Sequence, residues 1–247
     1  MNNIYRTKWP RALLLALALA AGQHAAAQTT LEKTSMQTAQ TLSPKQQAIA
    51  PIAAFMASGQ MAQLQTALGQ GLDAGLSVND CKEILVQLYA YAGFPRSLNA
   101  LNALMAVLEQ RKARGIEDAQ GIESEPAPEG EALLAAGTAN QTRLVGAPVQ
   151  GPVFAFAPQI DRYLKTHLFG DIFARSNLDW QSRELATVAA LAAMSGVEAQ
   201  LLSHVKVSLN VGLSVPQLRQ FFAVLAEQGS PEAAQRAQAA LQKAGHE

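Results

Sequence analysis

The sequence predicts an all-helical protein that contains two copies of one helical unit. Three observations support this fold class: apolar residues recur at three- and four-residue spacing after residue 42, strand patterns are almost absent, and one helical stretch is repeated. With 247 residues, of which 49% are hydrophobic, the chain can form a substantial core without disulfide or metal cross-links. The 19 basic and 19 acidic residues balance, which argues against a nucleic-acid binder driven by net charge.

Residues 1–27 have the pattern of a signal peptide. A basic start precedes an apolar run from Ala12 to Ala21, and the small residues Ala25 to Ala27 follow. The apolar run is about half of the ~20 residues that span a bilayer. We therefore expect cleavage after Ala27, a periplasmic or secreted protein, and no membrane association after cleavage. Residues 28–41 are rich in Thr, Gln and Ser and are predicted to form a flexible leader.

Residues 42–114 are predicted to form the first helical unit. Ser43 and Pro44 are typical of a helix start, and Gly75 is typical of a helix end. Gly93 and the Pro95 that follows it interrupt the pattern before the last helix of this unit. Four helices are predicted in this unit. The first begins at residue 44 and the second covers residues 61–72. The third follows Ser77 or Asn79, and the fourth covers residues 96–112. The last helix has an apolar stripe of Leu98, Leu101, Leu104, Met105 and Leu108.

Residues 115–130 have the composition of a linker, because Gly, Pro and acidic residues replace apolar ones. The helical pattern resumes near Glu131, and residues 131–247 are predicted to form the second unit. Within it, Val149–Phe156 is briefly strand-like, but its Gly-Pro pair favours an extended loop.

An internal repeat relates the two units. Residues 62–78 align without a gap on residues 199–215, with eight of seventeen positions identical. Under this alignment and its extension to the preceding helix, Ala48 corresponds to Glu184 and Ala67 corresponds to His204. A position that tolerates alanine does not need a carboxylate or an imidazole for folding. We therefore interpret the first unit as a structural copy and the second as the active copy.

Glu184 and His204 are the candidate catalytic pair. They lie on successive helices joined by a tight turn around Met194–Gly196, and such an antiparallel pair can bring them face to face. A partly buried glutamate beside a histidine is an arrangement used for proton transfer near neutral pH. The same residues are also compatible with a solvated Arg183–Glu184 pair and a histidine bonded to a backbone carbonyl. No metal site is predicted, because the other histidines lack ligand-type spacing to His204.

Cys81 is the single cysteine, so no internal disulfide is possible. Two interpretations are open for it. Near a helix start it can be a small buried apolar residue, or it can be a lone thiol activated by the helix N-terminus.

These motifs together resemble the carboxymuconolactone decarboxylase family, within the superfamily of alkylhydroperoxidase D. The resemblance covers most of the chain that follows the signal peptide. It is carried by Phe169–Ile172, Arg175, Leu178–Asp179, Arg183–Leu185, Gln200–Leu201, His204, Asn210–Ser214 and, in the first copy, Leu88–Leu101.

The resemblance implies an all-helical fold with an antiparallel helical hairpin, and a homo-oligomer, either a trimer or a hexamer. It also implies decarboxylation of a small lactone without any cofactor. Glu184 and His204 would be the acid/base pair, while Arg183, Arg175 and Asn210 would bind the substrate. The alkylhydroperoxidase D branch uses two cysteines seven and four residues before the histidine, and here Val197 and Gln200 occupy those positions. Its thiol chemistry therefore lacks its nucleophile.

Three functions remain open at this point. The first is a cofactor-free lyase or isomerase that acts on a small lactone or carboxylate through Glu184 and His204. The second is a peroxide-linked oxidoreductase of the peroxiredoxin or alkylhydroperoxidase type, relying on Cys81 or an external thiol. The third is a non-catalytic periplasmic binding or assembly protein that retained the helical scaffold.

Overall fold

Two helices of the first repeat, those that begin at Pro44 and Val78, have a serine side chain as their N-terminal cap. The computed structural model describes residues 41–245; the predicted signal peptide, and the predicted leader except for its last residue, lie outside this range. Ser43 caps the first helix by accepting a hydrogen bond from the Gln46 backbone N–H, which closes a capping box. The first repeat consists of α2 (Pro44–Ser58), α3 (Met61–Asp73), α4 (Val78–Gln87), α5 (Tyr89–Ala92) and α6 (Phe94–Ala113).

The second repeat has four helices, which follow the order of α2, α3, α4 and α6 in the first repeat; the short helix α5 has no counterpart among them. Its turns repeat as well: Gly75 and Gly212 occupy equivalent turns with φ of 95° and 94°, a conformation that glycine adopts without steric cost. Ser77 and Ser214 form equivalent capping boxes at the start of the next helix. The second repeat consists of α10 (Trp180–Ala192), α11 (Glu198–Asn210), α12 (Val215–Glu227) and α13 (Pro231–Lys243). The all-helical fold with two tandem copies is therefore confirmed for the described residues.

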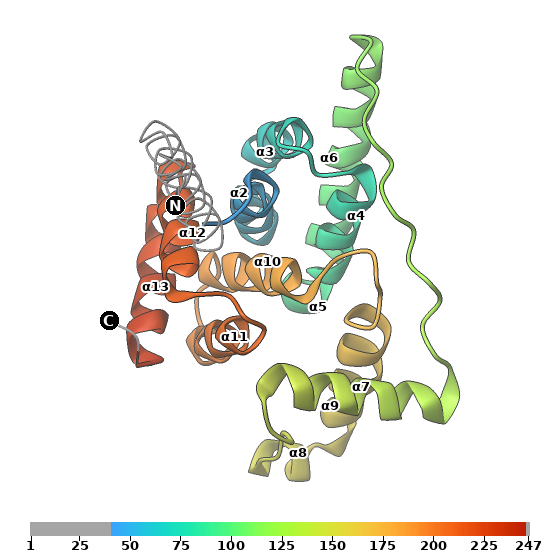
Figure 1. Cartoon of the computed structure of the whole chain (residues 1–247), viewed down its shortest axis with the longest axis vertical. Helices are drawn as coiled ribbons and strands as arrows, with labels where there is room; N and C mark the ends of the chain where they lie inside the picture. The colour runs from blue at the N-terminus through green and yellow to red at the C-terminus, as the bar shows by residue number, and fades with distance from the viewer. Residues whose placement is uncertain (1–40, 246–247) are drawn as a thin grey trace, which may run out of the picture. The chain divides into compact units, whose positions relative to one another are not determined.

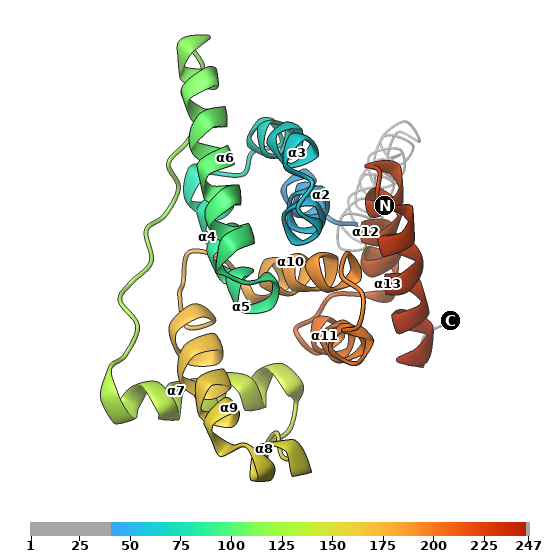
Figure 2. The same cartoon turned by 180° about the vertical axis from the view of Figure 1, so that it is seen from behind.

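The two repeats share one hydrophobic core, and α2 and α10 lie against each other at its centre (Figures 1 and 2). Ile52 on α2 and Val188 on α10 are both fully buried there. Alanine-rich faces on both helices allow close approach of the two backbones, since alanine side chains take little space. Helix α11 packs on α10, and α13 packs on α11 and α12. Helix α10 therefore lies between α2 of the first repeat and α11 of its own repeat.

An additional segment connects the repeats. Helix α7 packs on the π-helix η1 around a second, smaller apolar cluster that includes Leu144 and Phe169. Gly137 on α7 has no space for a Cβ atom, which would collide with the Lys165 carbonyl oxygen. The helical elements of this segment are α7 (Gly130–Val145), α8 (Pro152–Phe156), α9 (Pro158–Tyr163) and η1 (Leu164–Ile172).

The chain between α6 and α7 is an extended strap that runs back past α6 and α4 (Figure 1). The carbonyl oxygens of Ala119 and Gln120 accept hydrogen bonds of 2.9 Å each from the first two backbone N–H groups of α4. The strap therefore satisfies donors that a helix N-terminus leaves free. Among the described helices, none has the length and apolar character needed to cross a membrane.

Three local expectations require correction. The apolar stripe expected on α6 is only partly in the core: Leu104 is buried, Leu101 and Leu108 pack partly buried against the core, and Leu98 and Met105 are 56% and 60% exposed. The segment that ends at Phe156 forms the short helix α8, since Pro152 sits at its first turn, where proline is tolerated. The third helix of the first repeat ends at Gln87, and the separate helix α5 follows.

Candidate active site

Helix α10 places Glu184 in the interior. Asp179 caps this helix, and its Oδ1 accepts a hydrogen bond of 2.9 Å from the Ser182 backbone N–H. Glu184 follows in the second turn, and its side chain is fully buried. A buried carboxylate is costly unless it has a partner, so the contacts of Glu184 decide its role.

The partner of this carboxylate is His204 on α11. The turn after Ala192 reverses the chain, and Oε2 of Glu184 lies 2.8 Å from Nδ1 of His204. The His204 side chain is 14% exposed, so the pair lies at the edge of the core with the imidazole on its outer side. The hairpin thus brings the two residues together as expected. The alternative of a histidine bonded to a backbone carbonyl through Nδ1 is wrong.

Tyr91, on α5 of the first repeat, completes this cluster. Its ring meets the His204 ring edge-on, with centroids 5.4 Å apart and planes at 81°. Its hydroxyl is enclosed and, within residues 41–245, makes no hydrogen bond of normal geometry, although the Thr187 side chain lies close enough to lower its pKa; Oε1 of Glu184 also lacks a hydrogen-bond partner there. Burial raises the pKa of Tyr91, and the charge of Glu184 raises it further, although Thr187 and Arg183 act in the opposite direction. The phenol is therefore a neutral hydrogen-bond donor beside Glu184 and His204.

Sequence reasoning assigned no functional role to Tyr91, because its spacing places it on the apolar face of a helix. The signal that could have identified it is the hydroxyl itself. A buried tyrosine hydroxyl usually finds a partner. A hydroxyl without one, in the same cluster as a carboxylate that also has an oxygen without one, suggests where a bound molecule could supply a hydrogen bond.

Arg183, the residue before Glu184, is fully buried and has a different set of partners. Its guanidinium donates to Oε1 of Glu83 at 2.9 Å, to Oε1 of Gln87 at 3.0 Å, and to the carbonyl oxygens of Leu178 and Arg175. Arg183 therefore joins the two repeats, and its donors are occupied by protein atoms. This placement gives it a structural role in the fold. The alternative of a solvated Arg183–Glu184 pair is wrong, since neither side chain reaches solvent.

Glu83, on α4, is the acidic centre of this network. Besides Arg183 it binds Nε of Arg175, at 2.9 and 3.0 Å, and Nδ2 of Asn177, at 3.0 Å. Burial alone would raise the pKa of Glu83, but Arg183, Asn177 and Arg175 together hold it below its usual value. Arg175 thus also has a protein carboxylate as its partner.

A family model described as "Carboxymuconolactone decarboxylase family" matches residues 22–106 and 158–243. The chain belongs to this family. The first matched segment includes α2 to α5 and part of α6, and the second includes α9, η1 and α10 to α13. No curated protein matches the chain at a significant level.

The third expected substrate-binding residue of this carboxymuconolactone decarboxylase family member, Asn210, lies at the end of α11. Its Nδ2 donates to the Val145 carbonyl oxygen at 2.8 Å. Asn210 therefore ties α11 to the end of α7. The structure brings Glu184 and His204 together, and it places Arg183, Arg175 and Asn210 in contacts with other parts of the protein.

Cys81 is fully buried on α4. Burial, followed by the charges of Asp80 and Asp118, raises the pKa of its thiol to about 12. The thiolate is the reactive form of cysteine, so this environment suppresses nucleophilic chemistry. The interpretation of Cys81 as a small apolar core residue is the one that fits these surroundings.

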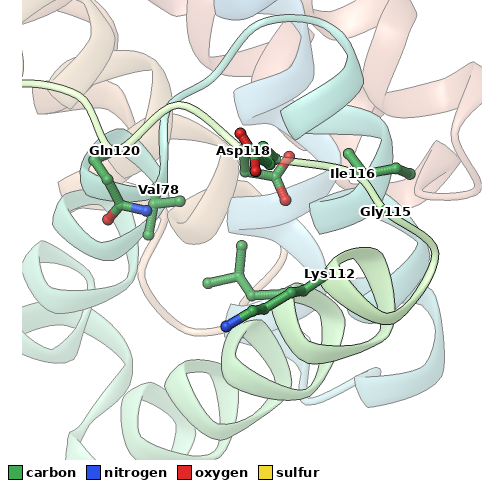
Figure 3. Close-up of a pocket in the computed structure, with 8 residues that line it drawn as sticks. Val78, Lys112, Gly115, Ile116, Asp118 and Gln120 are labelled. Carbon is green, nitrogen blue, oxygen red and sulfur yellow. The ribbon is translucent and has the colours of Figure 1, made fainter.

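A surface hollow lies at the end of α6. Lys112 borders it on one side, and Asp118 and Gln120 of the strap border it on the other (Figure 3). The carboxylate of Asp118 is already engaged, because it binds the guanidinium of the buried Arg111 at 2.8 to 3.0 Å. The Asp118 carboxylate in this hollow therefore serves to hold the strap against α6. Within the described residues, no group of three or more His, Cys, Asp and Glu side chains could hold a metal ion.

Proposed function

We propose that this protein is a cofactor-free lyase or isomerase of the carboxymuconolactone decarboxylase type, which moves a proton at a carbon atom of a small unsaturated lactone or carboxylate. The observation that supports this proposal best is the buried hydrogen bond of 2.8 Å between Glu184 and His204. Family membership supports the reaction class, whereas the substrate is an inference from the chemistry of the pair.

In this proposal Glu184 orients the imidazole and His204 transfers the proton. The carboxylate accepts a hydrogen bond from Nδ1–H, which fixes the ring and leaves Nε2 facing the reacting carbon. In a decarboxylation, the bond between the ring carbon and the carboxylate breaks and carbon dioxide leaves. The electron pair enters the conjugated lactone, and imidazolium donates its proton to the ring. In an isomerisation, Nε2 takes a proton from one carbon and returns it to another.

Tyr91 stabilises the negative charge that develops in either reaction. Its neutral hydroxyl donates to the oxygen that becomes an enolate, and this oxygen supplies the partner that the hydroxyl lacks in the protein. A low-dielectric, enclosed position makes such a donor more effective than it is in water.

The peroxide-linked alternative has less support, because the buried Cys81 has a raised pKa and because Val197 and Gln200 are not thiols. The binding-protein alternative predicts that ligand affinity survives changes to the pair. We also propose, from sequence alone, export through residues 1–27 to the periplasm or beyond, and assembly into a trimer or hexamer. Mass spectrometry of an exported protein that begins at Gln28, and its mass in solution, would test these two points.

The experiment for the proposed function is release of carbon dioxide from 4-carboxymuconolactone, the substrate for which the family is named. We expect turnover by the wild-type protein and a loss of about 100-fold or more in Glu184→Gln and in His204→Gln. Glu227→Gln, at an exposed position on α12, is the matched control and should keep full activity. Equal turnover in all four proteins would contradict the proposal. Ligand binding without any turnover, unaffected by both substitutions, would favour the binding-protein alternative.

A further inference from the structure

A cavity of about 500 Å3 lies between the first repeat and the connecting segment, where α5 and the start of α6 face α9 and η1. Three aromatic residues, Tyr89, Phe94 and Tyr163, form much of its wall together with Ile160, Leu164 and His167. This volume falls in the range of small-molecule sites, which are mostly apolar with a few placed polar groups.

The aromatic rings in this wall are arranged to present flat apolar surface. Tyr89 stacks on Phe94 with ring centroids 4.3 Å apart and planes at 23°, and the His167 ring lies 5.5 Å from that of Tyr89. Phe94 is 62% exposed and Tyr163 is 57% exposed. Covering such rings with another planar ring removes apolar surface from water and adds favourable stacking geometry.

His167 supplies the polar group of the cavity. Its Nδ1 lies 2.9 Å from Oδ2 of Asp171, one turn further along η1. When Nδ1–H donates to this carboxylate, Nε2 of the neutral ring is a hydrogen-bond acceptor. Nε2 has no partner among residues 41–245 and is enclosed. The side chain as a whole is about half exposed, but Nε2 itself is shielded, so we expect the neighbouring wall of the cavity to move when a ligand contacts Nε2, while the bond from Nδ1 to Asp171 is kept.

The backbone that carries this histidine supports the assignment independently. Residues 164–172 form a π-helix, a rare conformation that occurs frequently at functional sites. The absence of charged side chains from the cavity lining determines which ligands the cavity can bind. Its lining includes no lysine, arginine, aspartate or glutamate, and the ammonium group of nearby Lys165 is bound to Asp161 at 2.6 Å. An anionic ligand would lose its hydration without gaining a cation.

We propose that this cavity binds a small, uncharged, planar aromatic compound that carries a hydroxyl group, with the hydroxyl donating to Nε2 of His167. The ligand class is thus a neutral phenol. This proposal does not depend on the proposed function, because neither Glu184, His204 nor Tyr91 lines the cavity. Loss of turnover in the catalytic variants and loss of phenol binding can therefore be observed separately.

The test uses the full chain and 2-naphthol as the probe, with naphthalene and 2-naphthoate for comparison. Binding is followed by calorimetry and by the NMR signals of the His167 ring. We expect saturable binding of 2-naphthol, at least about tenfold tighter than that of naphthalene or 2-naphthoate, with a shift of the His167 signals. His167→Phe keeps an aromatic ring and should remove the preference of 2-naphthol over naphthalene.

A second variant tests the location of the ligand. Ala90 is exposed and lines the cavity, so Ala90→Trp should fill it and weaken binding by about tenfold or more, while Ala223→Trp, at an exposed position on α12, should not. The proposal is wrong if 2-naphthol binds equally to Ala90→Trp, or if naphthalene binds as tightly as 2-naphthol to the wild type. A failure of 2-naphthol to bind, together with a lower oligomeric mass of Ala90→Trp, would assign the cavity to a second copy of the chain and overturn the proposal.

Discussion

The ring of Tyr91 in the first repeat lies edge-on to the ring of His204 in the second, with centroids 5.4 Å apart. The candidate acid/base site therefore contains side chains of both repeats. At the positions that correspond to Glu184 and His204, the first repeat has Ala48 and Ala67. The first repeat therefore still contributes a side chain to the site through α5, although it has neither the carboxylate nor the imidazole.

Tyr91→Phe tests whether the phenol acts on the substrate. We expect turnover to fall by about 100-fold, because the developing enolate loses its donor, and we expect kcat to fall more than KM rises. The thermal midpoint should stay equal or rise, since the substitution removes an enclosed hydroxyl that has no partner among the described residues. Tyr163→Phe, at an exposed tyrosine, is the control for turnover. A fall in the midpoint with unchanged turnover would mean that Tyr91 is structural.

Glu83→Gln tests the ion-pair network between the repeats. Removal of this carboxylate leaves the buried guanidinium of Arg183 without its counter-charge, and breaking a buried pair in this way costs about 3–5 kcal/mol of unfolding free energy. Urea denaturation at pH 7 measures the loss. Glu109→Gln, on the exposed side of α6, should change the free energy by less than about 0.5 kcal/mol. Equal stability of the two variants would contradict a central role for the network.

The pH dependence of stability follows from the same group. The pKa of Glu83 in the folded protein is held below its ordinary value of 4.5. Its contribution to stability is therefore fully present above pH 4.5 and is lost as the pH falls through the lower, folded-state pKa. Unfolding free energies measured from pH 7 down to pH 3 should decline more steeply in the wild type than in Glu83→Gln. Parallel curves would show that another carboxylate controls acid unfolding.

The environment of Cys81 predicts an unreactive thiol. Because the side chain is fully buried and its pKa is raised to about 12, a thiol reagent at pH 8 should label the folded protein slowly and the urea-unfolded protein fast. Cys81→Ala should keep full turnover in the lactone assay. Rapid labelling of the native protein, or peroxide-dependent activity that Cys81→Ala abolishes, would restore the thiol mechanism.

Gly137→Ala tests the packing of α7 on η1 in the connecting segment. Alanine normally favours a helix by about 1 kcal/mol over glycine, but a Cβ here collides with the Lys165 carbonyl oxygen on η1. We expect Gly137→Ala to destabilise the protein by about 1–3 kcal/mol, since α7 must move away from η1. Gly69→Ala, at a helical position with free space, should have the opposite sign. Thermal unfolding of both variants measures the difference.

The sequence predicted the helices, their caps and the repeat because these features depend on local chemistry. Ser43, Gly75 and Ser77 act within a few residues of their own positions, so their patterns can be identified without a structure. The meeting of Glu184 with His204 was also predictable, since a short turn leaves a helical hairpin few ways to pack.

Contacts between distant parts of the chain could not be read in this way. Glu83 and Arg183 are a hundred positions apart, and neither spacing nor composition indicates that they bind each other. The apolar stripe of α6 was assigned to the core, but the pattern does not say which of two apolar faces the core covers, and Leu98 lies outside. Tyr91 was overlooked for the same reason, because its role depends on a helix of the other repeat.

The proposed function requires transfer of a proton between His204 and a substrate carbon, and incorporation of solvent deuterium measures this transfer most directly. The lactone is incubated with the protein in D2O and the product is analysed by proton NMR. We predict one deuterium at the reprotonated carbon with the wild type, and a rate of incorporation about 100-fold lower in His204→Gln and in Glu184→Gln. Incorporation at the wild-type rate in both variants would contradict the account.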